Sequence, residues 1–175
     1  RENGLPQDPT GTAVGTAPGE TMAGFEGPGP EESQNEAGGQ AGAMVGNGMV
    51  EVDSLAELSK SIGFSVLEVK NIPFEVTSTV YTNGWNEFAQ VEYQGESQDE
   101  AVLFRKARGT DDISGDYNVY SDVKEITVNE VSVTLKGDEG QYKLAIWQQD
   151  GFAYSLSYEP GGSENVFVEM IQSVQ

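Results

Sequence analysis

Three turn signals separate alternating apolar segments after residue 50, and they constrain the fold more than any other feature of the chain. The first is Asn83-Gly84 in FEVTSTVYTNGWNEFAQVEY, and Asn-Gly is the strongest two-residue signal of a β-hairpin. A turn at this dipeptide fixes the register on both sides of it. It predicts the cross-strand pairs Phe74–Tyr93 and Val76–Val91.

The second signal is Asn129-Glu130 in EITVNEVSVTLKG. Pairing about this turn gathers the apolar side chains on one face of the hairpin: Ile126, Val128, Val131, Val133 and Leu135. The polar side chains share the other face, which we expect to be solvated: Thr127, Ser132 and Thr134.

The third signal is Asp150-Gly151 in YKLAIWQQDGFAYSLSY. It predicts the pairs Trp147–Tyr154 and Ala145–Leu156, with Leu144 and Ile146 on the opposite face. This hairpin therefore has two apolar faces, and each face needs a cover.

Two helical patterns flank these strands. SLAELSKSI has capping-box spacing between Ser54 and Glu57 and is expected to end near Gly63, while SENVFVEMIQSV is amphipathic. With DEAVLFRKAR as a further strand, the sequence predicts an α+β fold. We expect a single twisted antiparallel sheet of about seven strands, with an N-terminal and a C-terminal helix covering one face.

The N-terminal part of the chain has a different composition. Residues 1–50 hold 12 of the 22 glycines and 5 of the 7 prolines, and Phe25 is their single aromatic residue. A segment with so little apolar surface cannot offset the entropy cost of ordering its backbone. We therefore expect a disordered Gly/Pro/acidic tether over 1–49 and a globular domain over 50–175.

Composition also limits the chemistry. The chain has 29 acidic and 9 basic side chains, a formal net charge of −20, and neither histidine nor cysteine. Zinc sites, iron–sulfur clusters and cysteine or serine–histidine nucleophiles are thus excluded, and nucleic acid is a poor partner. No run of about 18 apolar residues is present, so we expect no membrane insertion by this fragment, and we expect no cofactor.

Three segments carry a resemblance to a known group of proteins: RKARGTDDISGDYNVY, VTLKGDEGQYKLAIWQQDGFAYSLSY and the closing helix. Together they resemble an uncharacterised family of extracytoplasmic domains of Gram-positive, including gut clostridial, lipoproteins and membrane-tethered anti-sigma-factor-like proteins. The resemblance runs from about Ser54 to Gln175. It implies a secreted, cell-surface location with an anchor upstream of Arg1, and it carries no site residues.

The stretch GTDDISGDYNVY concentrates oxygen ligands. Asp112, Ser114 and Asp116 have the opening spacing of an EF-hand calcium loop, but the later positions of that motif do not fit. The alternative is structural, with these side chains forming Asx-type turns while the acidic residues balance the basic residues just upstream. Those basic residues are Arg105, Lys106 and Arg108.

The aromatic face of the third hairpin is the predicted ligand-binding surface: Trp147, Phe152, Tyr154, Leu156 and Tyr158. The competing interpretation makes one face of the hairpin core and has the N-terminal helix or loops shield the other. The predicted ligand is an unknown small molecule, lipid or cell-envelope component.

No nucleophile elbow, phosphate-binding loop or metal-ligand cluster occurs in the predicted domain. The sequence therefore favours a noncatalytic, tethered binding or sensing module. The alternative is a carboxylate-dependent hydrolase acting on cell wall or glycans, for which Glu87 and Glu125 on predicted strands are the carboxylates considered.

Overall fold

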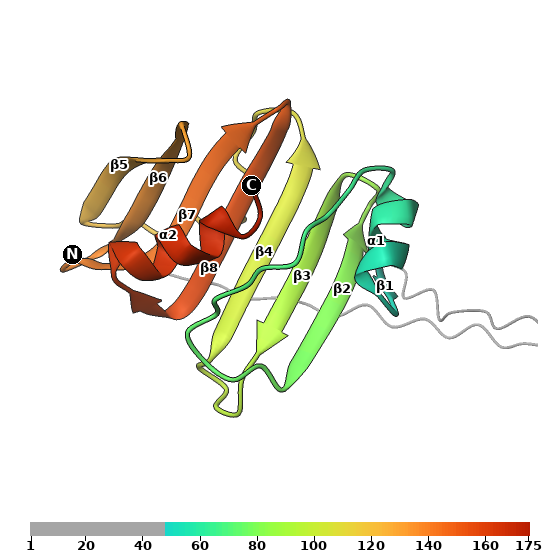
Figure 1. The fold of residues 1–175 in the computed structure, drawn as a ribbon, viewed down its shortest axis with the longest axis horizontal. Helices are drawn as coiled ribbons and strands as arrows, with labels where there is room; N and C mark the ends of the chain where they lie inside the picture. Colours follow the sequence, from blue (N-terminus) through green and yellow to red (C-terminus); the bar gives the residue numbers. More distant parts are fainter. Residues whose placement is uncertain (1–47) are drawn as a thin grey trace, which may run out of the picture. The chain divides into compact units, whose positions relative to one another are not determined.

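The computed structural model describes residues 48–175, which form eight strands and two helices (Figure 1). The strands make one antiparallel sheet in the order β1-β2-β3-β4-β8-β7-β6-β5. The chain thus builds the sheet from one edge to its centre, crosses to the far edge, and returns to the centre. The strands are β1 Met49–Val52, β2 Ser78–Gly84, β3 Phe88–Gln94, β4 Ala101–Arg108, β5 Asp122–Val128, β6 Val131–Asp138, β7 Gln141–Gln149 and β8 Phe152–Gly162.

The predicted fold class is confirmed in its main features, but the strand count is eight rather than about seven. The additional strand is β1, which pairs antiparallel with β2 through Val50 opposite Asn83. Sequence reasoning missed β1 because it has four residues, too few for a clear alternation, and because it follows the glycine-rich stretch directly. The rest of the predicted tether, up to residue 47, lies outside the described residues.

The second and third hairpins have the predicted register. Val128 pairs with Val131 across the β5–β6 turn, and Trp147 pairs with Tyr154 across the β7–β8 turn. All four turn residues have positive φ angles, as type I′ hairpin turns require. The angles are 46° for Asn129, 68° for Glu130, 52° for Asp150 and 80° for Gly151.

The predicted register of the first hairpin is wrong. Val91 pairs with Tyr81 instead of Val76, and both Phe74 and Val76 precede β2. The strands are displaced because the turn lies beyond the Asn-Gly dipeptide. As a result, Glu87 lies in the turn and not on a strand, contrary to the prediction.

Side-chain hydrogen bonding explains where this turn forms. Trp85 and Asn86 take the positive φ angles, 51° and 60°, and the N–H of Asn86 donates to Oδ1 of Asn83 at 2.9 Å. Gly84 belongs to the strand, where a Cβ would lie 2.4 Å from the ring of Phe88. The glycine is thus required for close packing and not for the turn itself.

Both predicted helices are present. Helix α1, Leu55–Ile62, begins after Ser54, whose Oγ accepts a hydrogen bond from the N–H of Glu57 at 3.2 Å. It ends at Gly63, which adopts the left-handed conformation with φ 79°. Helix α2, Glu164–Gln172, packs against β7, β8 and β5.

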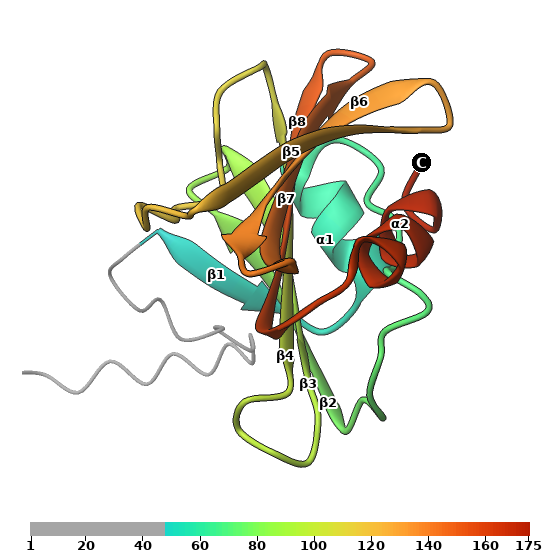
Figure 2. The ribbon, with the colours of Figure 1, turned by 90° about the vertical axis from the view of Figure 1, so that its left-hand side faces the viewer.

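The two helices lie on the same side of the sheet (Figure 2). We call this the helix-covered face. Its apolar side chains and those of the helices form the main core, which buries Val91, Phe104, Leu135, Leu156, Leu58, Phe167, Met170 and Ile171 almost completely.

The opposite side of the sheet is crossed by residues 109–121, which connect β4 to β5 and have no regular secondary structure (Figure 2). We call this the loop-covered face. It carries Arg105, whose guanidinium donates to the carbonyl oxygens of Ile113 (3.1 Å) and Ser114 (2.8 Å). The third hairpin therefore has a cover on each face, as its two apolar faces require.

Candidate functional site

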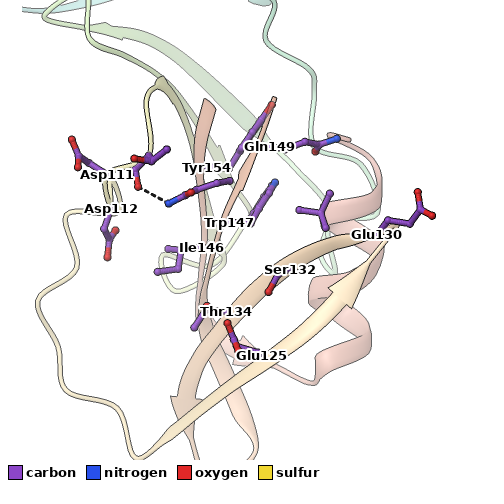
Figure 3. Close-up of a pocket in the computed structure, with 13 residues that line it drawn as sticks. Asp111, Asp112, Glu125, Glu130, Ser132, Thr134, Ile146, Trp147, Gln149 and Tyr154 are labelled. Carbon is purple, nitrogen blue, oxygen red and sulfur yellow. Dashed lines mark hydrogen bonds between the residues drawn. The ribbon is translucent and has the colours of Figure 1, made fainter. Parts of the chain in front are cut away.

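A cavity of about 560 Å³ lies between the start of the 109–121 segment and the β5–β6 hairpin (Figure 3). Its lining includes four carboxylates, from Asp111, Asp112, Glu125 and Glu130. Hydroxyl and amide groups come from Thr110, Ser132, Thr134, Gln148 and Gln149. The less polar part of the wall is Val131, Ile146, Trp147 and Tyr154. We call it the Trp147 cavity.

The cavity is assembled from segments that are distant in sequence. Residues 110–112 form one wall, the β5–β6 hairpin forms another, and the β7–β8 hairpin lies between them (Figure 3). The Nε2 of Gln148 donates to the carbonyl oxygen of Thr110 at 2.6 Å and ties the first wall to β7. Because Ile146 and Trp147 point to opposite faces of their strand, the cavity reaches both faces of the sheet at the end of β7.

The charge of the cavity lining is strongly negative. Asp111, Glu125 and Glu130 make no side-chain hydrogen bond or ion pair within residues 48–175. Asp112 has one cation near it, the ammonium group of Lys136 at 3.8 Å. No lysine or arginine belongs to the described lining.

Two buried polar atoms at the cavity wall have no hydrogen-bond partner among the described residues. They are the indole Nε1 of Trp147, a side chain that is 4% exposed, and the Oε1 of the half-buried Gln149. An unpaired buried polar group is rare and calls for an explanation, because it has lost its hydrogen bonds to water.

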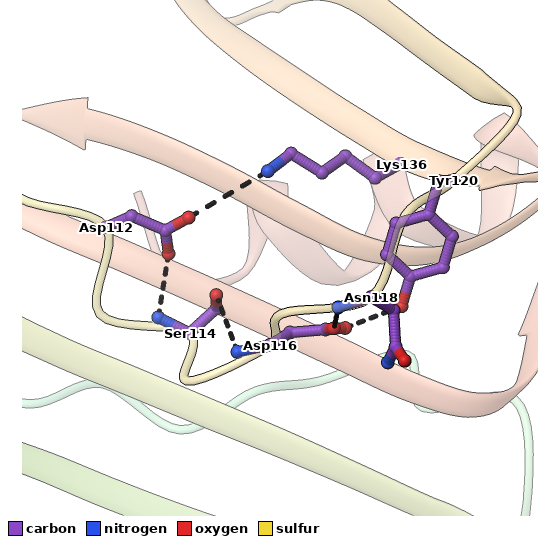
Figure 4. Close-up of polar contacts among 6 residues, drawn as sticks. All are labelled: Asp112, Ser114, Asp116, Asn118, Tyr120 and Lys136. Atoms are coloured by element: carbon purple, nitrogen blue, oxygen red, sulfur yellow. Dashed lines mark hydrogen bonds and ion pairs between the residues drawn. The ribbon is translucent and has the colours of Figure 1, made fainter.

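The 109–121 segment is shaped by its own polar side chains (Figure 4). Asp112 Oδ1 accepts from the N–H of Ser114 at 2.9 Å, Ser114 Oγ from the N–H of Asp116 at 3.2 Å, and Asp116 Oδ1 from the N–H of Asn118 at 2.8 Å. These are successive Asx- and Ser-type turns of the kind that the structural alternative predicts. The segment has a defined path without helix or strand.

Tyr120 completes this arrangement by donating its hydroxyl hydrogen bond to Asp116 Oδ2 at 2.5 Å. Burial, together with this hydrogen bond, raises the pKa of Tyr120 to about 12. Burial by itself would raise the pKa of Asp116, but the hydrogen bonds from Tyr120 and Asn118 outweigh it and lower that pKa.

Within residues 48–175 no group of three or more histidine, cysteine, aspartate or glutamate side chains is placed to hold a metal ion. Asp112, Ser114 and Asp116 all accept hydrogen bonds from the segment's own backbone. Calcium binding at these residues stays a prediction of the sequence, and their observed contacts are those of turn-forming residues.

The basic residues before the segment do not act together as expected. Arg105 contacts the segment, whereas Lys106 donates to the carbonyl oxygen of Ser65 and Arg108 to that of Gly63, both at 2.8 Å on the helix-covered face. Lys106 also lies 4.4 Å from the ring centre of Phe152. The prediction that all three pair with the acidic side chains of the loop is therefore wrong within residues 48–175. Arg105 bonds backbone carbonyls of the segment, and Lys106 and Arg108 lie on the other face because alternate residues of a strand point to opposite faces.

The five predicted ligand-binding residues lie on one face, as expected, and that face is the helix-covered one. Trp147 and Tyr154 stack with ring centres 5.0 Å apart and planes 3° apart. Leu156 is fully buried, Phe152 packs on Phe64, and Tyr158 stacks on Phe74.

Of these five residues, Trp147 and Tyr154 line the cavity. Burial, with a contribution from Asp150, raises the pKa of Tyr154, so its hydroxyl is neutral at ordinary pH. Ligand binding by the five residues stays a prediction.

Sequence reasoning missed most of the cavity lining. Ser132 and Thr134 were expected on a solvated face, and Gln148, Gln149 and Glu130 were not singled out. The available signal was the alternation of β6 and β7, which places Thr134 and Ile146 on one face, but it does not reveal that residues 110–112 close over them.

Comparison with protein-family models, curated proteins and solved structures gave no match for this chain. In the part that the structure describes, neither helix has the length and apolar character needed to cross a membrane.

Proposed function

We propose that the chain is a noncatalytic binding or sensing module, held outside the cytoplasm by an N-terminal tether, and that its ligand binds in the Trp147 cavity. The extracytoplasmic location rests on the resemblance of the three sequence segments. The tether rests on the glycine- and proline-rich composition of residues 1–49.

The observation that carries the binding proposal is the cavity itself. Its volume of about 560 Å³ falls within the range of about 300 to 1,000 Å³ that is usual for small-ligand sites. Three separate segments contribute charged and hydrogen-bonding groups to it. The four carboxylate side chains among them are exposed, and the less polar part of the wall lies between their two segments.

The noncatalytic part of the proposal rests on the sequence, because no nucleophile elbow, phosphate-binding loop or metal-ligand cluster occurs in the predicted domain.

A ligand screen on the full-length chain tests the proposal. The Trp85→Phe variant leaves Trp147 as the single tryptophan, so fluorescence reports on the cavity wall. Peptides, amines, glycan fragments, peptidoglycan fragments and lipids are added in turn, and their turnover is followed by mass spectrometry. We expect one class to bind and remain unchanged.

Two matched variants localise the binding. Thr134→Arg puts a large side chain into the cavity, whereas Ser97→Arg adds the same side chain at an exposed position outside its lining. Binding should be lost in the first variant and kept in the second. Equal binding by both would contradict the proposed site, and turnover of a glycan would favour the hydrolase instead.

A further inference from the structure

The Trp147 cavity has a charge that selects its ligand. Four exposed carboxylates belong to its lining, Asp111 and Asp112 on one side and Glu125 and Glu130 on the other, and the Glu130 side chain points outward from the cavity (Figure 3). Three of them have no partner within residues 48–175, and the fourth has a cation only at 3.8 Å. Like-charged groups around a concavity reinforce one another's field, so the cavity attracts a cation and repels phosphate and carboxylate groups.

The aromatic residues of the cavity restrict the ligand further. Trp147 and Tyr154 are stacked on each other and are 4% and 7% exposed, so their ring faces are occupied. A flat ligand ring, such as a nucleobase or the apolar face of a sugar, finds no free aromatic surface to stack on. Recognition in this cavity therefore depends on charge and hydrogen bonding.

The unpaired polar atoms at the cavity wall indicate which hydrogen-bonding groups the ligand carries. Trp147 Nε1 is a donor and Gln149 Oε1 is an acceptor. Both atoms are enclosed, so a ligand reaches them when the side chains of the cavity wall move. A peptide unit offers the complementary pair, because its carbonyl oxygen accepts and its N–H donates.

Resting on the proposed function, we infer that the ligand of the Trp147 cavity is a short, basic peptide segment. Its lysine or arginine side chains pair with the carboxylates, and its backbone pairs with Trp147 and Gln149. A simple polyamine carries the charge but has no acceptor for the indole N–H, and a neutral peptide has the backbone groups without the charge.

The test uses the full-length Trp85→Phe chain and four probes. These are acetyl-Lys-Gly-Lys-amide, the neutral acetyl-Gln-Gly-Gln-amide, the acidic acetyl-Glu-Gly-Glu-amide, and spermidine. We expect the lysine peptide to change Trp147 fluorescence saturably, with an affinity that falls as salt is added. The other three probes should bind at least about tenfold more weakly, which corresponds to about 1.4 kcal/mol.

A matched pair of triple variants separates a specific site from the general charge of the protein. One variant combines Asp111→Asn, Glu125→Gln and Glu130→Gln, which removes three lining charges that make no internal contact. The control combines Glu68→Gln, Glu75→Gln and Glu139→Gln, three exposed carboxylates outside the cavity. The lysine peptide should bind about tenfold more weakly to the first variant and unchanged to the control.

Four results would overturn the inference. If spermidine binds as tightly as the lysine peptide, the cavity recognises charge alone. If both triple variants weaken binding of the lysine peptide equally, the peptide is attracted nonspecifically by the general charge of the protein. Failure of the lysine peptide while another compound from the wider screen occupies the cavity would reject the basic peptide and leave the proposed function standing. If no probe or screened compound binds, both proposals fail.

Discussion

The two faces of the sheet are covered by different means. On the helix-covered face, one row of side chains runs across five strands through directly paired residues: Val91, Phe104, Leu156, Ala145 and Leu135. The neighbouring row on the loop-covered face runs through Gln90, Arg105, Ser155, Ile146 and Thr134. Four of these five residues are polar, and yet Gln90 and Ser155 are only 4% and 2% exposed and the other three are half-buried.

This difference shows how a polar face can be closed without a helix. Apolar burial is non-directional, and helices satisfy it with side chains alone. A half-buried guanidinium needs acceptors, and Arg105 obtains them from Gln90 Oε1 at 2.8 Å and from the carbonyl oxygens of Ile113 and Ser114. The start of the 109–121 segment lines the Trp147 cavity, which lies where the two faces of the sheet meet around β7.

The largest effect should come from the helix-covered face. Trp147→Ala empties a tightly packed position and should lower the free energy of unfolding by about 3 to 5 kcal/mol, measured by chemical denaturation. Trp85→Ala is the control, because Trp85 is 54% exposed, and it should cost about 1 kcal/mol or less. Equal losses in the two variants would show that Trp147 is not a core residue.

The second largest loss of stability should come from Arg105, which holds the 109–121 segment on the loop-covered face. Arg105→Ala removes the hydrogen bonds to Gln90, Ile113 and Ser114, and it should cost about 1 to 3 kcal/mol. Amide hydrogen exchange in residues 109–121 should accelerate. Arg108→Ala, which removes contacts on the other face, should leave that exchange unchanged; acceleration in both variants would argue against a specific anchor.

A smaller effect is expected inside the 109–121 segment. Tyr120→Phe removes the hydrogen bond to Asp116 and should cost about 0.5 to 1.5 kcal/mol near neutral pH. Because the pKa of Asp116 is lowered in the folded chain, this stabilisation is present above the ordinary aspartate pKa and is lost as pH falls through the lowered value.

The difference in melting temperature between the wild type and Tyr120→Phe should therefore become smaller on acidification. Thermal melts between pH 7 and pH 3 measure it. Tyr117→Phe is the control at a side chain that is 95% exposed, and it should match the wild type throughout. A difference in melting temperature that stays constant with pH would mean that the hydrogen bond does not favour ionised Asp116.

The smallest effect is expected from calcium. Since Asp112 and Asp116 are hydrogen-bonded within the segment, millimolar calcium should shift the melting temperature no more than magnesium at equal ionic strength. A calcium-specific rise that disappears in the Asp112→Ala, Asp116→Ala double variant would establish the metal site that the spacing predicts.

Sequence predicted the parts of the fold that depend on local chemistry. The registers of the last two hairpins followed from turns whose residues adopt positive φ angles, and α1 followed from the Ser54 cap. The first register failed because Asn83 bonds Asn86 through its side chain and Gly84 serves close packing. No pattern in the sequence distinguishes that use of Asn-Gly from a turn.

The cavity could not be predicted in the same way. Its walls meet because the chain crosses from β4 to the far edge strand β5 and then returns, which brings residues 110–112 beside the β5–β6 hairpin. That approach depends on strand order, and strand order is not encoded in the spacing of residues. The aromatic residues of the third hairpin were correctly placed on one face, but their cover depends on Phe64 and Phe74 from a segment without periodicity.

The central claim is that ligand binds where the two faces meet, in the Trp147 cavity, and not on the part of the helix-covered face around Phe64 and Phe74. Amide NMR of the labelled full-length chain, titrated with acetyl-Lys-Gly-Lys-amide, tests it most directly. The account predicts the largest shifts at Asp111, Ser132 and Gln148, which line the cavity. Shifts concentrated at Phe64 and Phe74, with Ser132 and Gln148 unchanged, would contradict it.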